Sequence, residues 1–342
     1  MIRIVTDSSS DLDLDQAAQL QVDVIPIHIY FGQTEYLDRQ DLSVTDFYTK
    51  LETVEQLPTT SQITPFQFYQ TFQPYIEAGD EIVGIFLSSQ LSGTFQSAQA
   101  AQQMLKTEQI HLVDSLNAAL GHHLLIQIAV RLRDQGMSAQ QIAQQLTELS
   151  KKVRLIACVK TMKYLVMGGR VSAAVAKIGS VLGITPIISL VDGKVENVGK
   201  ARGHKAAIRW IQHQLEKEPA AQQYPVVFSH SVNPQGRDEL VQELDAFLPN
   251  QDYLYCDLGS TVGTTLAQAP LVLLILPNNK MIADDITHCR QSFFISPEIN
   301  STTLSKIISR KIKLDTFQKC LLQTSFVSPK IIHRYLLLTF QA

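Results

Sequence analysis

The chain has 342 residues, of which 45% are hydrophobic and 18% are charged, and its formal net charge is −3. The apolar content is too high for a disordered chain, and the length suggests about two domains. The charge gives no reason to expect a nucleic-acid ligand or a polybasic membrane anchor. The first residues contain no long apolar h-region, and the aliphatic run 271–276 is far shorter than the ~20 residues that cross a bilayer. We therefore expect a cytoplasmic protein without stable membrane insertion.

Strand and helix signals alternate along the first 160 residues. Apolar runs predict strands at 2–5, 22–31, 81–87, 110–113 and 155–159. Capping patterns and hydrophobic periodicity predict helices at 43–51, 64–79, from 92 onward, at 117–134 and at 139–151. Nearly continuous apolar strands joined by helices favour a parallel sheet that is covered on both faces. We assign residues 1–159 to an N-terminal α/β domain built on such a sheet.

The pattern changes after about residue 160. Small apolar residues predict a helix at 172–182, and Asp192-Gly193 lies between two runs that predict a hairpin of 186–190 with 194–198. Further signals predict, in order, a helix at 204–217, a strand at 225–229, a helix at 236–247 and a strand at 253–257. This order indicates a smaller α+β domain at 160–264.

Serine, threonine and aspartate cluster where the strands of the first domain end. The clusters are Thr6-Asp7-Ser8, Ser88-Ser89 and Asp114-Ser115, and ligands of parallel sheets usually bind beyond such strand ends. The loop that contains Ser92 leads directly into a helix, which gives Ser92 two interpretations. It is an ordinary helix N-cap, or its hydroxyl joins the free N–H groups of the helix start in binding a carboxylate or phosphate.

No sequence pattern for catalysis or metal binding is convincing. The G-x-S-x-G, Walker A, H-E-x-x-H, C-x-x-C and G-x-G-x-x-G patterns are all absent. Adjacent His122 and His123 point in different directions from a helix, so we expect structural or solvated roles for them. His230 ends an apolar strand and is either a general base or a structural histidine. The four cysteines are widely spaced, and we expect no metal and no cofactor.

Two arginines lie in loops beside glycines. Arg170 follows Gly168-Gly169, and Arg202 precedes Gly203. An ordinary surface arginine in a turn fits this pattern, and so does an exposed guanidinium that contacts a partner or a phosphate. The sequence pattern alone leaves both alternatives open.

Taken together, several segments of the chain resemble the DegV family, the bacterial fatty-acid-binding proteins. The matching segments are Thr6-Asp7-Ser8-Ser9, Pro26, Asp38, Asp41-Leu42-Ser43 with Phe47-Tyr48, Thr60-Ser61-Gln62, Leu87 to Thr94, Asp114-Ser115, Gly168 to Ser172 and Lys200-Ala201-Arg202-Gly203. Each segment alone is a weak signal, whereas their order and spacing over residues 1 to about 264 are specific.

The resemblance implies two α/β-type domains that hold a long-chain fatty acid between them. Family members present the bound carboxylate to a separate ATP-dependent fatty acid kinase and supply no phosphoryl-transfer site of their own. Carried over by motif, the resemblance implies that Arg170 and Arg202 lie on the surface that meets the kinase. It implies that five residues surround the carboxylate: Thr60, Ser61, Ser92, Gly93 and Thr94.

The resemblance ends near residue 264. Family members usually continue with Gly-Thr-His-x-Gly-Pro-Gly-Ala-Leu-Gly, whose histidine is a further head-group ligand, whereas this chain reads Gly263-Thr264-Thr265-Leu266. Residues 265–342 contain none of the 16 glycines. They hold nine Lys and Arg against four Asp and Glu, while the rest of the chain holds 20 against 28.

Codon degeneracy offers an explanation for this break, because one base inserted after the codon for Thr264 restores the family motif. We hypothesise a single-base deletion near Thr265 that makes residues 265–342 an aberrant, out-of-frame tail with little native structure. A genuine divergent extension is the alternative, since composition bias also occurs in real tails.

The sequence thus predicts a carrier that binds a long-chain fatty acid, is not itself an enzyme and works with a fatty acid kinase. Two alternatives stay open. One is a serine-dependent hydrolase or transferase that uses Ser92 with a histidine such as His230, and the other is a phosphosugar-binding module.

Overall fold

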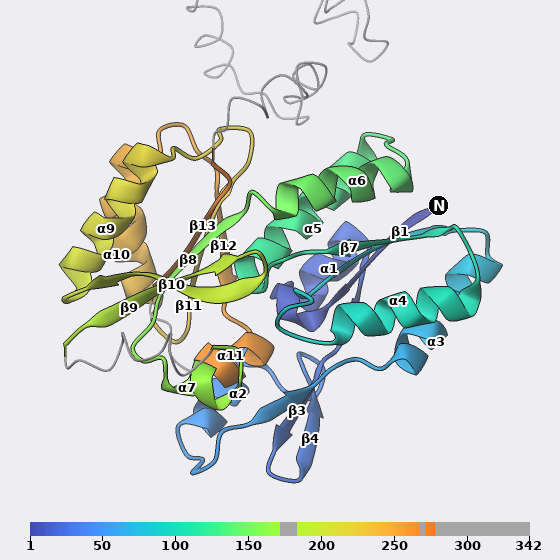
Figure 1. The fold of residues 1–342 in the computed structure, drawn as a ribbon, viewed down its shortest axis with the longest axis horizontal. Helices are drawn as coiled ribbons and strands as arrows, with labels where there is room; N and C mark the ends of the chain where they lie inside the picture. The colour runs from blue at the N-terminus through green and yellow to red at the C-terminus, as the bar shows by residue number, and fades with distance from the viewer. Residues whose placement is uncertain (172–182, 267–270, 278–342) are drawn as a thin grey trace, which may run out of the picture. The chain divides into compact units, whose positions relative to one another are not determined.

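The computed structural model describes residues 1–171, 183–266 and 271–277. The predicted helix at 172–182 therefore lies outside the described residues. Residues 1–279 form one compact unit with three β-sheets and covering helices (Figure 1). None of the helices in the described ranges combines the length and the apolar character that crossing a membrane requires.

The first sheet is parallel throughout, and its four strands have the order β2-β1-β6-β7. These strands are β2 (Val22–Ile25), β1 (Ile2–Asp7), β6 (Glu81–Phe86) and β7 (Ile110–Asp114). The covering helices are α3 (Pro65–Glu77) with α4 (Thr94–Leu105) on one face, and α5 (Ala119–Asp134) with α6 (Ala139–Ser150) on the other (Figure 1). The predicted N-terminal parallel α/β arrangement is confirmed.

The predicted strand at 22–31 consists of two strands in different sheets. β2 ends at Ile25, and β3 (His28–Phe31) pairs antiparallel with both β4 (Thr34–Leu37) and β5 (Thr59–Ser61). Pro26 separates β2 from β3 and has no N–H for a ladder hydrogen bond, so it interrupts pairing at this point. The resulting three-stranded sheet carries Thr60 and Ser61 away from the first sheet.

Local sequence signals set the helix starts of the N-terminal part. Ser43 accepts a hydrogen bond from the N–H of Asp46 at 3.1 Å and caps α2 (Val44–Leu51). Thr64 and Gln67 form a capping box at the start of α3, where Pro65 occupies the first helical position. Both starts agree with the predictions from sequence.

The second sheet is mixed, and its six strands have the order β10-β9-β8-β13-β11-β12. These strands are β10 (Lys194–Ala201), β9 (Thr185–Val191), β8 (Arg154–Cys158), β13 (Leu271–Ile275), β11 (Val226–His230) and β12 (Tyr253–Asp257). Helices α9 (His204–Lys217) and α10 (Pro234–Leu244) pack on this sheet (Figure 1). The predicted α+β second part is confirmed.

Helix α5 joins the two sheets. It contacts β1 and β6 of the first sheet as well as β8, β11 and β13 of the second. Its side chains are buried nearly all round, which is the pattern of a helix that has neighbours on every side. The pocket described below lies beside the N-terminal end of this helix.

The structure differs from the expected domain limits at two strands. β8 lies within the predicted first domain, yet it pairs with β9 and β13, because an apolar run does not indicate which sheet it joins. The hypothesis of an aberrant tail predicts little native structure at 271–275, yet these residues form β13 between β8 and β11. Val272 to Leu276 are at most 2% exposed, so this part of the tail belongs to the core of the second sheet, and the change of reading frame stays a prediction.

Candidate functional site

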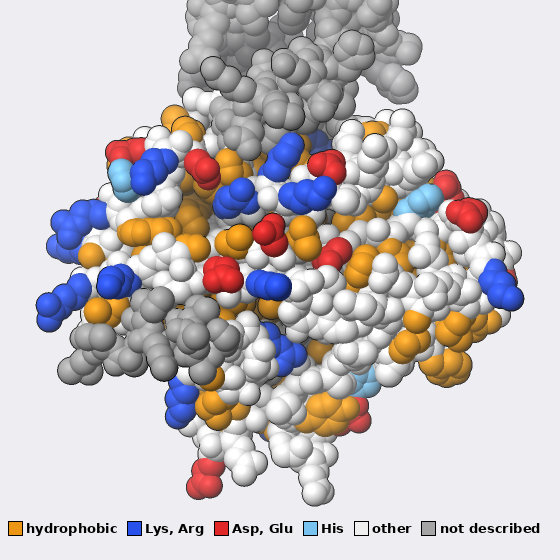
Figure 2. All heavy atoms as spheres, in the orientation of Figure 1, with side chains coloured by type: hydrophobic (Ala, Val, Ile, Leu, Met, Phe, Trp, Pro, Cys, Tyr) orange, Lys and Arg blue, Asp and Glu red, His pale blue; other side chains and the backbone are white. Residues whose placement is uncertain are grey.

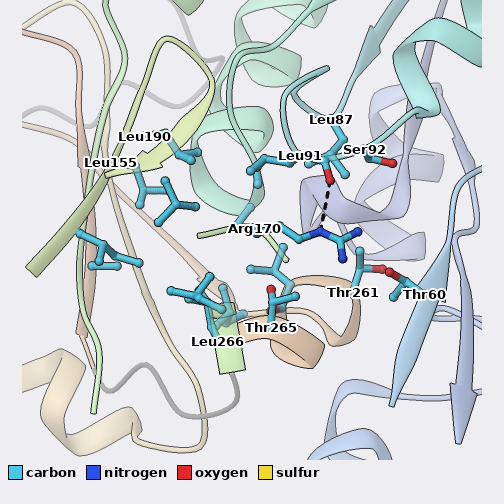
Figure 3. A pocket seen from close by; sticks show the side chains of 18 of the residues that line it. Thr60, Leu87, Leu91, Ser92, Leu155, Arg170, Leu190, Thr261, Thr265 and Leu266 are labelled. Carbon is cyan, nitrogen blue, oxygen red and sulfur yellow. Dashed lines mark hydrogen bonds between the residues drawn. The ribbon is translucent and has the colours of Figure 1, made fainter. Parts of the chain in front are cut away.

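A mostly apolar pocket lies between the N-terminal part of the chain and the second sheet. Its lining comes from β5, the β6–α4 loop, the start of α5, four strands of the second sheet, α7 (Lys163–Met167) and α11 (Ser260–Leu266) (Figure 3). Leucines form much of the wall: Leu87, Leu91, Leu155, Leu165, Leu190 and Leu266. A concave apolar lining with a few polar groups is typical of a site for a small organic ligand.

Hydroxyl groups from four segments share this lining. They belong to Thr60 and Ser61 on β5, Ser92 in the β6–α4 loop, Ser189 on β9, and Thr261 and Thr265 on α11. Ser92 Oγ lies 2.9 Å from Thr94 Oγ1 and accepts a weaker bond from the N–H of Thr94 at 3.3 Å. Ser92 therefore contacts the first turn of α4 and lines the pocket as well, so the capping and ligand interpretations do not exclude one another.

Arg170 is the only charged side chain among the described residues that line the pocket. Its Nε donates to the carbonyl of Leu91 at 3.2 Å, and its Nη1 donates to the carbonyl of Gly168. Figure 3 shows the guanidinium on the side of the pocket where Thr60, Ser92 and Thr261 lie. Positively charged N–H donors beside hydroxyl donors form an environment that favours an anion.

Arg170 lines the pocket and is half-buried. Gly169 has a φ of 72°, and this left-handed conformation turns the chain after α7 back toward the pocket. Arg202 is exposed and follows β10 directly, so the two arginines occupy different environments. Contact of either arginine with a partner stays a prediction.

The five residues expected around a carboxylate are not all in the lining. Thr60, Ser61 and Ser92 line the pocket, whereas Gly93 and Thr94 do not. Gly93 precedes α4 and packs against a neighbour, because a Cβ at this position would lie 2.0 Å from Gln62 Oε1. The absence of a side chain lets β5 approach the start of α4 closely.

The lining also contains polar residues that the sequence reasoning did not assign to it. These are Gln62, Arg170, Ser189, Thr261 and Thr265. Gln62 directly follows Thr60 and Ser61, which the sequence did assign to the site. Thr261 follows β12 in the run Asp257-Leu258-Gly259-Ser260-Thr261, a polar cluster at a strand end like the clusters of the first sheet. This repeated signal is the one that could have located Thr261.

A buried cluster of charged residues lies beside α11. Asp38 Oδ2 accepts hydrogen bonds from Ser8 Oγ at 2.8 Å and from Thr261 Oγ1 at 2.6 Å. Asp11 Oδ1 accepts a bond from the N–H of Gly259 at 3.0 Å, and Arg39 Nη2 lies 3.6 Å from the same oxygen. Burial raises the pKa of both carboxyl groups, and it raises that of Asp11 to about 7 despite the opposing charge of Arg39.

This raised pKa predicts a pH-dependent stability that depends on Asp11. The folded chain holds the Asp11 proton more tightly than the unfolded chain, whose carboxyl group has a pKa near 3.9. The contribution of Asp11 to the free energy of unfolding is therefore complete below about pH 4 and falls as the pH rises toward 7. Urea denaturation between pH 4 and 8 should show this fall in the native chain and a flatter profile in Asp11→Asn.

Several other ionisable groups lie close to Asp11. They are Arg39, Asp38, Tyr48 and Cys256, with His123 close to Arg39. Asp192→Asn, in the exposed turn between β9 and β10, is the matched control and should keep the native profile. Parallel profiles for Asp11→Asn and the native chain would contradict the prediction.

The adjacent histidines have interior positions. His122 is fully buried, and its Nε2 lies 2.9 Å from both Thr6 Oγ1 and the carbonyl oxygen of Ile85. His123 is also buried, and burial lowers its pKa to about 4. Among the described ranges, no group of three His, Cys, Asp or Glu side chains could hold a metal ion.

His230 belongs to a different cavity from Ser92. That second cavity is lined by α2 residues together with His230, Val232 and Asp257, and His230 Nε2 lies 3.4 Å from Asp257 Oδ1. Burial lowers the pKa of His230. Since Ser92 and His230 line separate cavities, the structure does not form the pair that the hydrolase alternative requires.

Comparison of the sequence with known proteins finds the same family in each case. A model of the DegV family, described as uncharacterised proteins, matches residues 1–274. A DegV domain-containing protein of Clostridium perfringens is 31% identical over 264 residues, which cover 77% of this chain and 93% of that protein. Protein DegV of Bacillus subtilis is 30% identical over 273 residues, covering 79% of this chain and 97% of that protein.

Solved structures show the same relationship. A DegV family protein of Thermus thermophilus, described by its fatty acid binding, is similar with a TM-score of 0.74 and 28% identity, covering 81% of this chain and 99% of that one. DegV of Bacillus subtilis, described as a fatty acid binding protein, has a TM-score of 0.71 and 29% identity, with coverages of 80% and 99%. The family model spans most of the sequence, including nearly all of the second sheet, and the solved structures have the same fold. The chain therefore belongs to the DegV family.

Proposed function

We propose that this protein is a cytoplasmic carrier that holds a long-chain fatty acid in the pocket between the N-terminal part of the chain and the second sheet. The observation that carries the proposal is a leucine-rich pocket whose only charged lining residue, within the described ranges, is Arg170. The solved relatives from Thermus thermophilus and Bacillus subtilis, described as binding fatty acids, support the same ligand class.

In this proposal, the carboxylate and the acyl chain of the ligand contact different parts of the lining. The carboxylate would accept hydrogen bonds from Arg170, Ser92 and the hydroxyls of β5, because charge-assisted bonds offset the loss of hydration. The acyl chain would lie against the leucines, where each buried methylene contributes about 0.8 kcal/mol. Native mass spectrometry of the purified chain tests this assignment. A bound C14–C18 acid supports the proposal, and a chain that stays empty after incubation with such acids contradicts it.

We further propose that the protein presents the bound carboxylate to an ATP-dependent fatty acid kinase. A basic surface supports this partner, since Lys200, Arg202, Lys205 and Arg209 are exposed and no Asp or Glu occurs from 197 to 215. Figure 2 shows Lys and Arg side chains on the side where α9 and β10 lie in Figure 1. A surface of this charge favours an acidic face on the partner and raises the rate of encounter.

Reversing the charge of Arg202 should separate partner binding from ligand binding. In Arg202→Glu, acyl phosphate formation with a fatty acid kinase should fall by about tenfold or more, because repulsion replaces attraction at the interface. Fatty acid affinity should stay unchanged, since Arg202 is exposed and does not line the pocket. Lys217→Glu at the end of α9 is the control. Equal rates for both variants and the native chain would refute this role of Arg202.

A further inference from the structure

Helix α11 forms one wall of the pocket through Thr261, Val262, Thr265 and Leu266. The helix and the two residues before it are fixed to the N-terminal part of the chain. Three hydrogen bonds make this connection, and we call them the α11 latch: Thr261 Oγ1 to Asp38 Oδ2 at 2.6 Å, Gly259 N to Asp11 Oδ1 at 3.0 Å, and Tyr48 Oη to Leu258 O at 3.1 Å.

Asp38 connects two segments that line the pocket. The oxygen that accepts from Thr261 also accepts from Ser8 Oγ at 2.8 Å, and Ser8 Oγ in turn accepts from the N–H of Ile27 at 3.0 Å. The N–H of Asp38 donates to the carbonyl of Ile27 at 3.0 Å. Ile27 lines the pocket from the N-terminal part, and Thr261 lines it from α11. Asp38 itself is 1% exposed and does not line the pocket.

The latch is opposed by the burial of its own charges. One oxygen of each carboxylate, Asp11 Oδ2 and Asp38 Oδ1, has no hydrogen-bond partner among the described residues. A buried polar group without a hydrogen-bond partner is less stable than the same group hydrated in water. Movement of α11 away from the N-terminal part would expose these oxygens to water. The contacts that hold α11 in place are therefore offset in part by the desolvation of the groups that make them.

The geometry points to α11 as the movable wall of the pocket, with Asp38, Asp11 and Tyr48 as positioning residues that set how often it opens. This inference rests on the proposed function, because what passes the wall is a fatty acid. Asp11, Asp38 and Tyr48 do not line the pocket, so in this proposal their bonds act on the wall and not on the bound ligand. A weaker latch should therefore raise the rate constants for entry and release together and leave the Kd nearly unchanged.

Two substitutions weaken the latch at separate points. Thr261→Val removes the donor to the Asp38 carboxylate. Because hydrogen bonds to charged groups are strong, loss of this bond should raise both rate constants about tenfold. Tyr48→Phe removes a neutral bond to the carbonyl of Leu258 from a side chain that does not line the fatty acid pocket, and it should raise both rate constants by about fivefold. Thr264→Val is the matched control, because the Thr264 hydroxyl donates only within α11, to the carbonyl of Thr261 at 2.8 Å.

Stopped-flow exchange of cis-parinaric acid on the full-length chain measures these rates, and far-UV circular dichroism checks that each variant is folded. Faster entry and release with an unchanged Kd in both latch variants, and native rates in Thr264→Val, is the expected result. Native rates in a folded Tyr48→Phe and Thr261→Val would overturn the latch and leave the proposed function standing. A rise in the release rate alone for Thr261→Val, with native rates in Tyr48→Phe, would assign Thr261 a direct ligand contact instead. No binding by the native chain would refute the proposed function itself.

Discussion

Replacement of Arg170 by glutamine should lower the affinity for a C16–C18 fatty acid by about 10- to 100-fold. Arg170 supplies the only positive charge in the described lining, and hydrogen bonds to charged groups are worth about 1.5–3 kcal/mol. Each 1.4 kcal/mol changes the Kd about tenfold. Glutamine keeps a planar hydrogen-bonding group, so the variant removes the charge with limited change in volume.

Titration calorimetry of the delipidated chain measures this effect. Arg209→Gln on the exposed face of α9 changes the net charge equally and should leave the affinity unchanged. A methyl ester of the same acid should bind the native chain and Arg170→Gln with similar affinity, because it lacks the negative charge. If the acid binds Arg170→Gln as tightly as the native chain, the carboxylate does not lie beside Arg170.

Truncation after residue 266 should unfold the second sheet, whereas truncation after residue 279 should not. The shorter chain lacks β13, which separates β8 from β11, and it loses the buried side chains of Val272 to Leu276. Five such side chains contribute about 8–15 kcal/mol together, at roughly 1.5–3 kcal/mol each. This is comparable to the whole stability of a domain, which is about 5–15 kcal/mol.

Circular dichroism and urea denaturation of the two truncated chains measure this difference. The chain that ends at residue 279 contains the complete compact unit and should unfold cooperatively, with the fatty acid affinity of the full chain. The chain that ends at residue 266 should lose both properties. A cooperative transition in the shorter chain would show that β13 is dispensable.

The first sheet could be predicted because its strands are local signals. The apolar runs of β1, β6 and β7 lie between helices, and an interior position on both faces requires that pattern. β8 has the same kind of apolar run but joins the other sheet, because pairing partners distant in sequence determine its place. The split of the expected strand at Pro26 could have been foreseen from the missing N–H alone.

The site was predicted less completely than the fold. Ser92, Thr60 and Ser61 came from motifs, and the structure brings these three together in one lining. The family resemblance predicted a partner contact for Arg170, whereas its glycine-flanked loop did not indicate that the side chain also lines the pocket. Thr265 occupies the position of the family histidine and lines the pocket. The deletion near Thr265 stays a prediction, which sequencing of the gene tests directly.

The central position of β13 determines when this protein can fold during synthesis. In the second sheet, Leu273 pairs with Ile156 and with Phe228, both of which leave the ribosome long before it does. The parallel sheet at the N-terminus can form earlier, but β8 and β11 have no strand between them until residue 275 has emerged. During that interval the face of α5 that later meets the second sheet is uncovered. Chaperones that bind exposed apolar surface would therefore engage the nascent chain at this stage, before a ligand pocket exists.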